Sequence, residues 1–102
     1  MVNYHSEKLK SGLYLVATPL GSARDITLRA LDVLSSCDAI AAEDTRSMRK
    51  LLNIHNIPIN DRPLLSYNDF NGDQVRPKIF EWLERNMAVA YASDAGMPLI
   101  AD

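Results

Sequence analysis

The sequence is poor in the residues that build covalent and metal cross-links. Its single cysteine, Cys37, excludes an internal disulfide, and the two histidines, His5 and His55, show none of the short ligand spacings of a zinc site. We therefore expect no metal and interpret both histidines as surface or hydrogen-bonded residues. Cys37 follows a predicted helix rather than a strand end, so we expect an inert, partly buried thiol instead of a nucleophile.

Long apolar runs are also missing. No stretch approaches the ~20 residues that cross a bilayer, and polar residues between Asn3 and Lys8 interrupt the apolar core that a signal peptide would need. We expect a soluble, cytoplasmic protein that has no membrane partner.

Glycine is scarce and scattered. The four glycines, Gly12, Gly21, Gly72 and Gly96, are too far apart for a phosphate loop of the Walker type or a dinucleotide fingerprint. The sequence also lacks the Gly-x-Ser-x-Gly elbow that presents a hydrolase nucleophile. These absences disfavour ATP hydrolysis, NAD chemistry and serine hydrolysis.

Excess positive charge, which marks many nucleic-acid-binding domains, is absent from the chain as a whole. A net charge of −2 over 102 residues, with 47% hydrophobic and 24% charged residues, is typical of one small globular domain. Locally, Arg46, Arg49 and Lys50 cluster on a predicted helix, where Arg46 and Lys50 share a face. This cluster either contacts phosphates or forms a solvated helix face.

The hydrophobic pattern predicts short apolar strands that alternate with amphipathic helices. We expect strands at residues 13–17, 39–42 and 87–92, and a further strand in which Leu64 and Leu65 lead into the polar residues 66–69. We expect helices at residues 25–36, from 44–45 to before Pro58, and from 71–73 to Asn86. Asn86 suits the left-handed position that ends a helix. Candidate N-caps are Asp25 or Thr27, Asp44 or Thr45, and Asn71 or Asp73.

This order of elements predicts an α/β fold. Because the strands are apolar throughout rather than alternating, we expect a parallel sheet with helices on both faces. The loops at residues 18–25, 43–46, 66–71 and 93–98 then share one rim, where ligands of such sheets bind. Each loop is also a good turn sequence in its own right, so a purely structural role stays open.

Four segments of the chain carry a resemblance to a known family. They are residues 13–21 (LYLVATPLG), 25–31 (DITLRAL), 39–46 (AIAAEDTR) and 93–102 (SDAGMPLIAD). In this order they resemble the amino-terminal half of the ribosomal RNA small-subunit methyltransferase I family, within the tetrapyrrole methylase superfamily. The resemblance implies a two-domain fold that uses S-adenosylmethionine, with residues 1–12 as a tail and residues 13–102 as an incomplete, truncated first domain that lacks its second domain.

The resemblance also implies a reaction. A homodimer would transfer a methyl group to the ribose 2′-hydroxyl of a cytidine in small-subunit (16S) ribosomal RNA, without a metal. Because members of the family complete the cofactor cleft with a second domain, we expect this piece alone to bind S-adenosylmethionine weakly and to be inactive. Two alternatives remain open: a methylase of the same superfamily that acts on a tetrapyrrole, another small molecule or a protein side chain, and a non-catalytic binding module.

Under this interpretation, the turns after the first and last strands form one wall of the cofactor pocket. The wall residues are Pro19, Leu20, Gly21, Ser93, Asp94, Ala95, Gly96 and Pro98. Candidates for the base that takes the 2′-hydroxyl proton are Glu43, Asp44 and Asp94. Each has a structural alternative: Glu43 could pair with Arg46, Asp44 could cap a helix, and Asp94 could fix its turn. The cations expected to contact RNA phosphates are Arg24, Arg46, Arg49 and Lys50.

Overall fold

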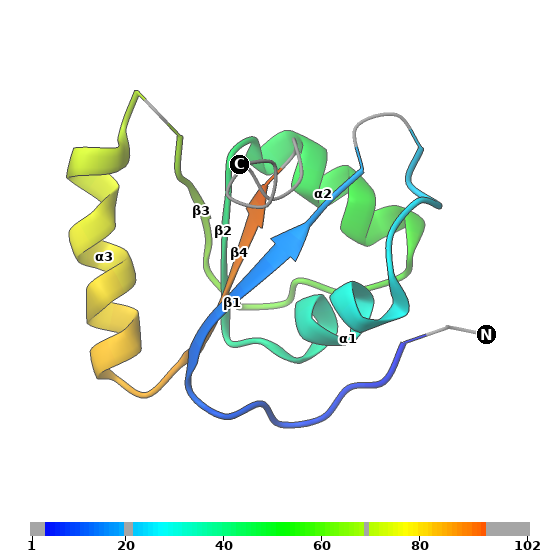
Figure 1. The fold of residues 1–102 in the computed structure, drawn as a ribbon, viewed down its shortest axis with the longest axis horizontal. Coiled ribbons are helices and arrows are strands. Elements are labelled where there is room, and N and C mark those ends of the chain that lie inside the picture. The colour runs from blue at the N-terminus through cyan, green and yellow to red at the C-terminus, as the bar shows by residue number, and fades with distance from the viewer. Residues whose placement is uncertain (1–3, 20–21, 69, 94–102) are drawn as a thin grey trace, which may run out of the picture.

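Four parallel strands organise the molecule (Figure 1). The computed structural model describes residues 4–19, 22–68 and 70–93. Its strands are β1 (Gly12–Ala17), β2 (Ala39–Ala42), β3 (Leu64–Ser66) and β4 (Ala88–Ser93), in the spatial order β1-β4-β2-β3. Its helices are α1 (Leu28–Ser36), α2 (Thr45–Ile54) and α3 (Gly72–Glu84). Every strand pair is parallel, so the predicted α/β fold and the order of its elements are confirmed.

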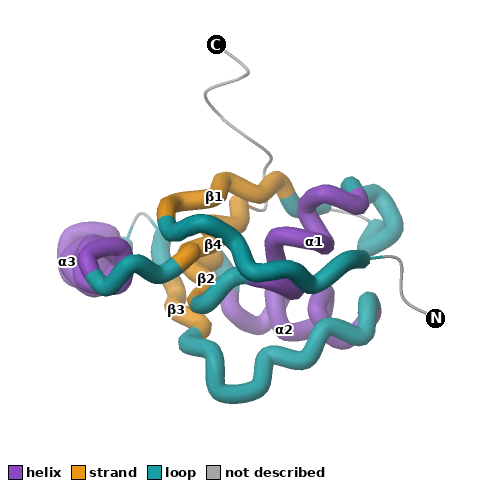
Figure 2. Tube along the Cα trace, turned by 90° about the horizontal axis from the view of Figure 1, so that it is seen from below, coloured by secondary structure: helices purple, strands orange, loops and turns teal. Residues whose placement is uncertain are grey.

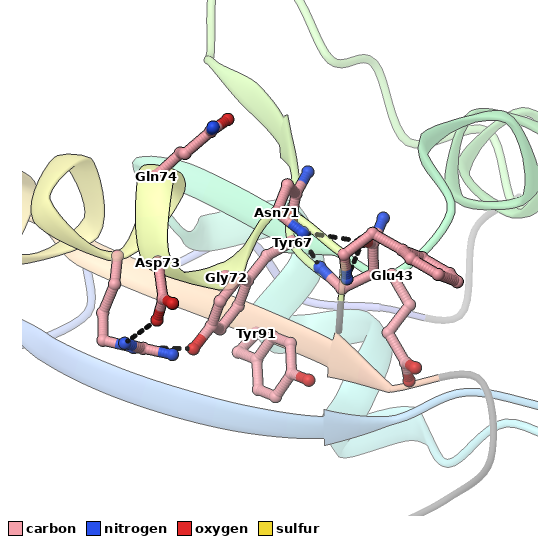
Figure 3. A pocket seen from close by; sticks show the side chains of 10 residues that line it. Glu43, Tyr67, Asn71, Gly72, Asp73, Gln74 and Tyr91 are labelled. Atoms are coloured by element: carbon pink, nitrogen blue, oxygen red, sulfur yellow. Dashed lines mark hydrogen bonds and ion pairs between the residues drawn. The ribbon is translucent and has the colours of Figure 1, made fainter.

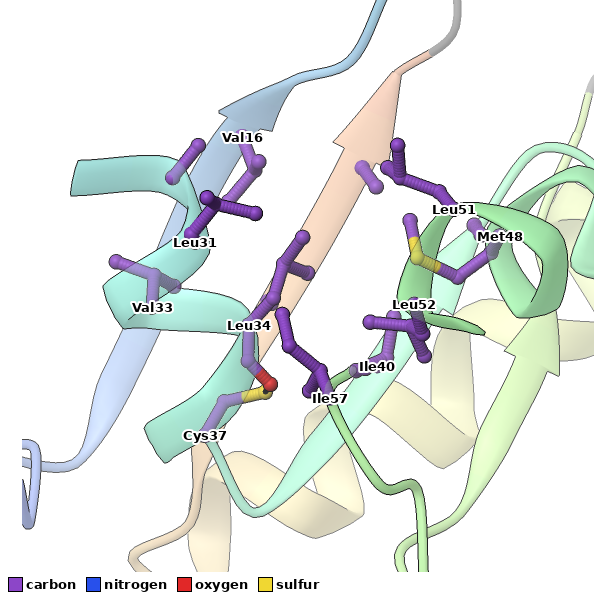
Figure 4. Packing of buried hydrophobic residues seen from close by; sticks show 14 residues of the cluster. Val16, Leu31, Val33, Leu34, Cys37, Ile40, Met48, Leu51, Leu52 and Ile57 are labelled. Atoms are coloured by element: carbon purple, nitrogen blue, oxygen red, sulfur yellow. Dashed lines mark hydrogen bonds between the residues drawn. The ribbon is translucent and has the colours of Figure 1, made fainter. Parts of the chain in front are cut away.

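The helices cover both faces of the sheet, as predicted. Figure 2 shows α1 and α2 on one side of the strands and α3 on the other. The larger core lies between the sheet and the first two helices, around the buried side chains of Leu31, Leu34 and Leu52 (Figure 4). The smaller core joins Ile79 and Trp82 of α3 to the opposite face of the sheet.

Alanine dominates the two central strands. Ala39, Ala41, Ala90 and Ala92 are each fully buried, with none of their surface exposed. Strands that are covered on both faces have no solvent side, which explains why β2 and β4 are apolar throughout rather than alternating. Most of the larger residues of the cores come from the helices, with Ile40 and Val89 as the large, fully buried side chains of these two strands.

The edge strand β1 differs from this pattern. Tyr14 and Val16 point into the core under α1, whereas Leu13 and Leu15 are 50% and 51% exposed. Continuous burial was therefore a correct expectation for β2 and β4 and a wrong one for β1. At the edge of the sheet, only one face of β1 packs against a helix among the described residues.

The structure shows which of the candidate residues occupy the N-cap positions of α1 and α3. The Thr27 hydroxyl accepts a hydrogen bond from the Ala30 amide at 3.0 Å, so α1 starts after Thr27, and Asp25 lies in the preceding turn. Asn71 occupies the N-cap position of α3 without capping it through its side chain. Asn86 has a φ of 63°, in the left-handed region predicted for it.

Arg62 ties the segment before β3 to the end of α1. Its Nη1 donates to the carbonyl oxygens of Leu34 at 2.7 Å and Cys37 at 3.1 Å, while Nη2 donates to that of Pro58 at 2.7 Å and Nε to that of Ile59 at 3.2 Å. One guanidinium thus satisfies four carbonyls from two separate segments, which a lysine ammonium on a flexible stem cannot reproduce.

Replacing this guanidinium is expected to destabilise the fold. Arg62→Met should lower the free energy of unfolding by about 2 kcal/mol, because several part-buried carbonyls lose their donor. Urea denaturation measures the change. The control is Arg85→Met, which removes a solvent-exposed ion pair to Glu81 and should change stability by about 0.5 kcal/mol or less. Equal effects of the two substitutions would contradict the role of Arg62.

Candidate functional site

A pair of hydrogen bonds fixes the rim of the sheet where β1 and β4 end. The Thr18 amide and the Thr18 hydroxyl both donate to the carbonyl oxygen of Ser93, at 3.0 Å and 2.8 Å. Thr18 and Ser93 are both buried. The chain therefore leaves β1 and β4 from adjacent points, which brings the first and last of the predicted rim loops together at their origins.

Only part of the predicted cofactor wall lies in the described structure. Pro19 follows directly on Thr18 and is half-buried, and Ser93 ends β4. The other wall residues fall outside the described residues: Leu20, Gly21, Asp94, Ala95, Gly96 and Pro98. Their roles stay predictions.

Of the predicted carboxylates, Glu43 and Asp44 directly follow β2 at the same rim. The Asp44 carboxylate accepts hydrogen bonds from the amides of Arg46 at 2.9 Å and Ser47 at 3.4 Å, so it caps α2. These bonds lower the pKa of Asp44, mainly through the Arg46 amide. Asp44 also forms an exposed ion pair with Arg46 at 3.6 Å. Asp44 is therefore held in the structural role that competed with catalysis, whereas Asp94 lies outside the described residues.

The four predicted phosphate contacts do not form one patch. Arg46, Arg49 and Lys50 are exposed on α2. Arg24 is exposed as well, but it lies near the other end of this helix. The carbonyl oxygen of its neighbour Ala23 is 2.7 Å from Nε2 of His55, which follows the last residue of α2, whereas Arg46 lies in the first turn. A helix of this length separates its ends by roughly 14 Å. The basic cluster predicted on α2 therefore exists as a surface, and Arg24 belongs to a different place.

The rim also contains a pocket that the sequence did not predict. It has a volume of about 430 Å³ and lies between the carboxyl ends of β2 and β3, the middle of β4 and the start of α3. The side chains that shape it include Glu43, Tyr67, Asn71, Arg76 and Tyr91 (Figure 3). A pocket of this size suits a small organic ligand.

Two tyrosines and an arginine form the inner wall of this pocket. The rings of Tyr67 and Tyr91 lie 5.5 Å apart between centroids and are tilted by 55°. Arg76 places its guanidinium 6.0 Å from the Tyr67 ring centre, and its Nε donates to the Tyr67 hydroxyl at 3.1 Å. Its Nη1 also pairs with Asp73 at 3.2 Å. The hydrogen bonds to Tyr67 and Asp73 raise the pKa of Arg76, which keeps it charged.

The first turn of α3 completes the pocket. The Asn71 side chain accepts a hydrogen bond from the Asn68 amide at 2.8 Å and donates to the carbonyl of Ser66 at 2.9 Å. Asn68 in turn accepts from the amide of Phe70 at 2.9 Å. The loop between β3 and α3 is therefore held by its own side chains and presents the Phe70 ring to solvent, where it is 99% exposed.

Cys37 and the histidines take no part in this site. Burial raises the pKa of the Cys37 thiol from 9.0 to about 11, so the thiolate is scarce at neutral pH and the expectation of an inert thiol holds. Within residues 4–19, 22–68 and 70–93, no group of histidine, cysteine and acidic side chains is placed to hold a metal ion. Among the described helices, none has the length and apolar character to cross a membrane.

The sequence of the chain matches the model of a known protein family. The family model described as "Tetrapyrrole (Corrin/Porphyrin) Methylases" matches residues 12–102. The chain belongs to this family. The match starts at the first residue of β1 and includes all of the described residues at the rim of the sheet.

Among curated proteins, the chain is similar to several named "Ribosomal RNA small subunit methyltransferase I". It is 49% identical to the one of Bacillus subtilis over 90 residues, which are 88% of this chain and 30% of that protein. Identity is 48% over 90 residues with the one of Mycoplasmopsis pulmonis, covering 88% of this chain and 39% of that protein. With that of Halalkalibacterium halodurans it is 42% over 100 residues, 98% of this chain and 34% of the relative. The chain thus spans about a third of the length of these relatives.

The role of Asp44 as a cap generates a test by pH. Asp44→Ala should lower the melting temperature at pH 7, and Asp44→Asn should lower it by less, because the asparagine oxygen still accepts the amide hydrogen bonds but carries no charge. Since the folded pKa of Asp44 lies below its ordinary value of 3.8, the carboxylate stabilises the fold above that pH and loses its effect as the pH falls through the folded pKa.

Thermal melts between pH 7 and pH 2 should therefore show that the difference in melting temperature between the wild type and Asp44→Ala, which we call the gap, narrows at low pH. The matched control is Asp61→Ala, an exposed carboxylate in the loop before β3, which should show no gap at pH 7. A gap that is constant across this pH range would contradict the capping role of the charged carboxylate.

Proposed function

We propose that the chain is part of a methyltransferase that moves the methyl group of S-adenosylmethionine to the ribose 2′-hydroxyl of a cytidine in small-subunit (16S) ribosomal RNA. The observation that carries the proposal is the combination of family membership with similarity, at 42–49% identity, to proteins named for methylation of that RNA. A cytoplasmic location and a homodimeric state belong to the same proposal.

The described part of the cofactor wall fits such a donor. The Thr18 hydrogen bonds to Ser93 align the ends of β1 and β4, so Pro19 and Ser93 lie at the carboxyl ends of two adjacent strands. Ligands of open parallel sheets bind beyond the carboxyl ends of the strands. When bound there, S-adenosylmethionine supplies an electrophilic methyl group on a sulfonium.

The chain's own contribution is then mainly alignment. Displacement at a sulfonium methyl group is in-line and disperses positive charge, so the protein has to hold the acceptor oxygen in line and keep water out. In this scheme the exposed cations of α2 bind RNA phosphates and set the position of the strand, without reading its sequence. Asp44 fixes the start of that helix, and with it Arg46.

One alternative draws on the name of the matched family, which refers to corrins and porphyrins. A tetrapyrrole acceptor would need a broad apolar surface beside the rim. The described pocket at the rim is instead lined mostly by charged, amide and phenol groups, together with Phe70. This lining and the α2 cations favour RNA as the acceptor.

A domain graft tests the proposal. Residues 13–102 replace the matching segment of the Bacillus subtilis relative, and the chimera is incubated with methyl-labelled S-adenosylmethionine and unmethylated small ribosomal subunits. We expect label in the RNA, recovered as 2′-O-methylcytidine after digestion, and no transfer by the 102-residue chain alone. A folded chimera that labels no RNA, or labels a base instead of a ribose, would contradict the proposal, and label in a tetrapyrrole would favour the alternative.

A further inference from the structure

The pocket beside Tyr67 and Tyr91 has the lining of a nucleobase site. Its lining includes two tyrosines and the exposed ring of Phe70, and unpaired bases of RNA are commonly recognised by stacking on aromatic side chains. The volume of about 430 Å³ is within the range of pockets that hold ligands of nucleoside size.

The charges of the lining favour a base over a phosphate. Two carboxylates, Glu43 and Asp73, and one cation, Arg76, line the pocket, and Arg76 is paired with Asp73. The net charge of the lining is therefore negative, which repels phosphate and suits a ligand that donates hydrogen bonds. In Figure 3, Glu43 and Asp73 lie at opposite ends of the pocket with the two tyrosine rings between them.

The glycine at the start of α3 lies close to two side chains of the pocket. A Cβ atom at position 72 would lie 3.2 Å from Nη2 of Arg76 and 3.2 Å from Cε1 of Tyr67. A side chain at this position would therefore require Arg76 and Tyr67 to shift by a few tenths of an ångström.

We propose that this pocket binds an unpaired cytosine of the RNA substrate, with the Glu43 carboxylate accepting a hydrogen bond from the exocyclic amine of the base. The inference rests on the proposed function. A carboxylate is the usual acceptor for the cytosine N4 amine, whereas uracil presents a carbonyl oxygen at the same place and is rejected. Glu43 then reads the base, and the phosphates on either side meet the cations of α2, which starts directly after Asp44.

The 102-residue chain itself is suited to the test. Amide chemical shifts are followed by NMR while cytidine or uridine, neither of which carries a phosphate, is added. We expect shifts concentrated at Tyr67, Gly72 and Tyr91, with cytidine bound about ten-fold more tightly than uridine, since a hydrogen bond to a charged group is worth at least this factor.

Substitutions assign the preference to Glu43. Glu43→Gln should bind the two nucleosides within about two-fold of each other, because a glutamine amide can pair with either base edge. Gly72→Ala should weaken the binding of both. The matched control is Glu84→Gln, an exposed carboxylate at the far end of α3, which should keep the wild-type preference. Shifts elsewhere, equal binding of both nucleosides by the wild type, or an unchanged preference in Glu43→Gln would overturn the inference.

The outcome separates this inference from the proposed function. A chimera that methylates RNA, together with a chain that shows no preference for cytidine, would contradict the pocket assignment alone. A chain with the expected preference whose chimera transfers no methyl group to RNA would contradict the proposed reaction and leave the base pocket standing.

Discussion

The parallel pairing of β4 with β1 on one side and β2 on the other fixes where the strands end and where their loops begin. β4 is the last of the described strands in sequence and lies inside the sheet, so segments from both halves of the chain must meet there. Its register places Ser93 opposite Ala17, next to Thr18, and Ala92 opposite Ala42, next to Glu43. These pairings set where the predicted rim loops after β1, β2 and β4 begin, and they set the position of the pocket.

Much of the fold could be predicted because it is encoded locally. Short apolar runs such as residues 39–42 become strands, and Met48, Leu51 and Leu52 recur at helical spacing on α2. The exposure of Leu13 and Leu15 could not be read in this way. It follows from the position of β1 at the edge of the sheet, and the order of parallel strands depends on contacts between distant segments.

The candidate site likewise contains residues that could be predicted from the sequence and residues that could not. Asp44 could be identified as a helix cap or a rim carboxylate because the acidic pair directly follows an apolar run. The pocket residues Tyr67 and Tyr91 belong to different elements, and only the fold brings their rings to 5.5 Å. The available signal was Tyr91 itself, the one residue with a polar-tipped aromatic side chain within the small and apolar sequence of β4. Gly72 gave no signal, because the close approach of Arg76 and Tyr67 is a tertiary contact.

Native-state hydrogen exchange measures whether β4 and β1 are joined at the rim. If the pairing of β4 organises the rim, the amides of Val89 to Ala92 should be among the slowest to exchange, and the Thr18 amide, which donates to Ser93 just beyond the end of β1, should be protected with them. Exchange of Thr18 at the rate of an open loop, while the β4 amides stay protected, would contradict the account, because β1 and β4 would then not be joined where the site begins.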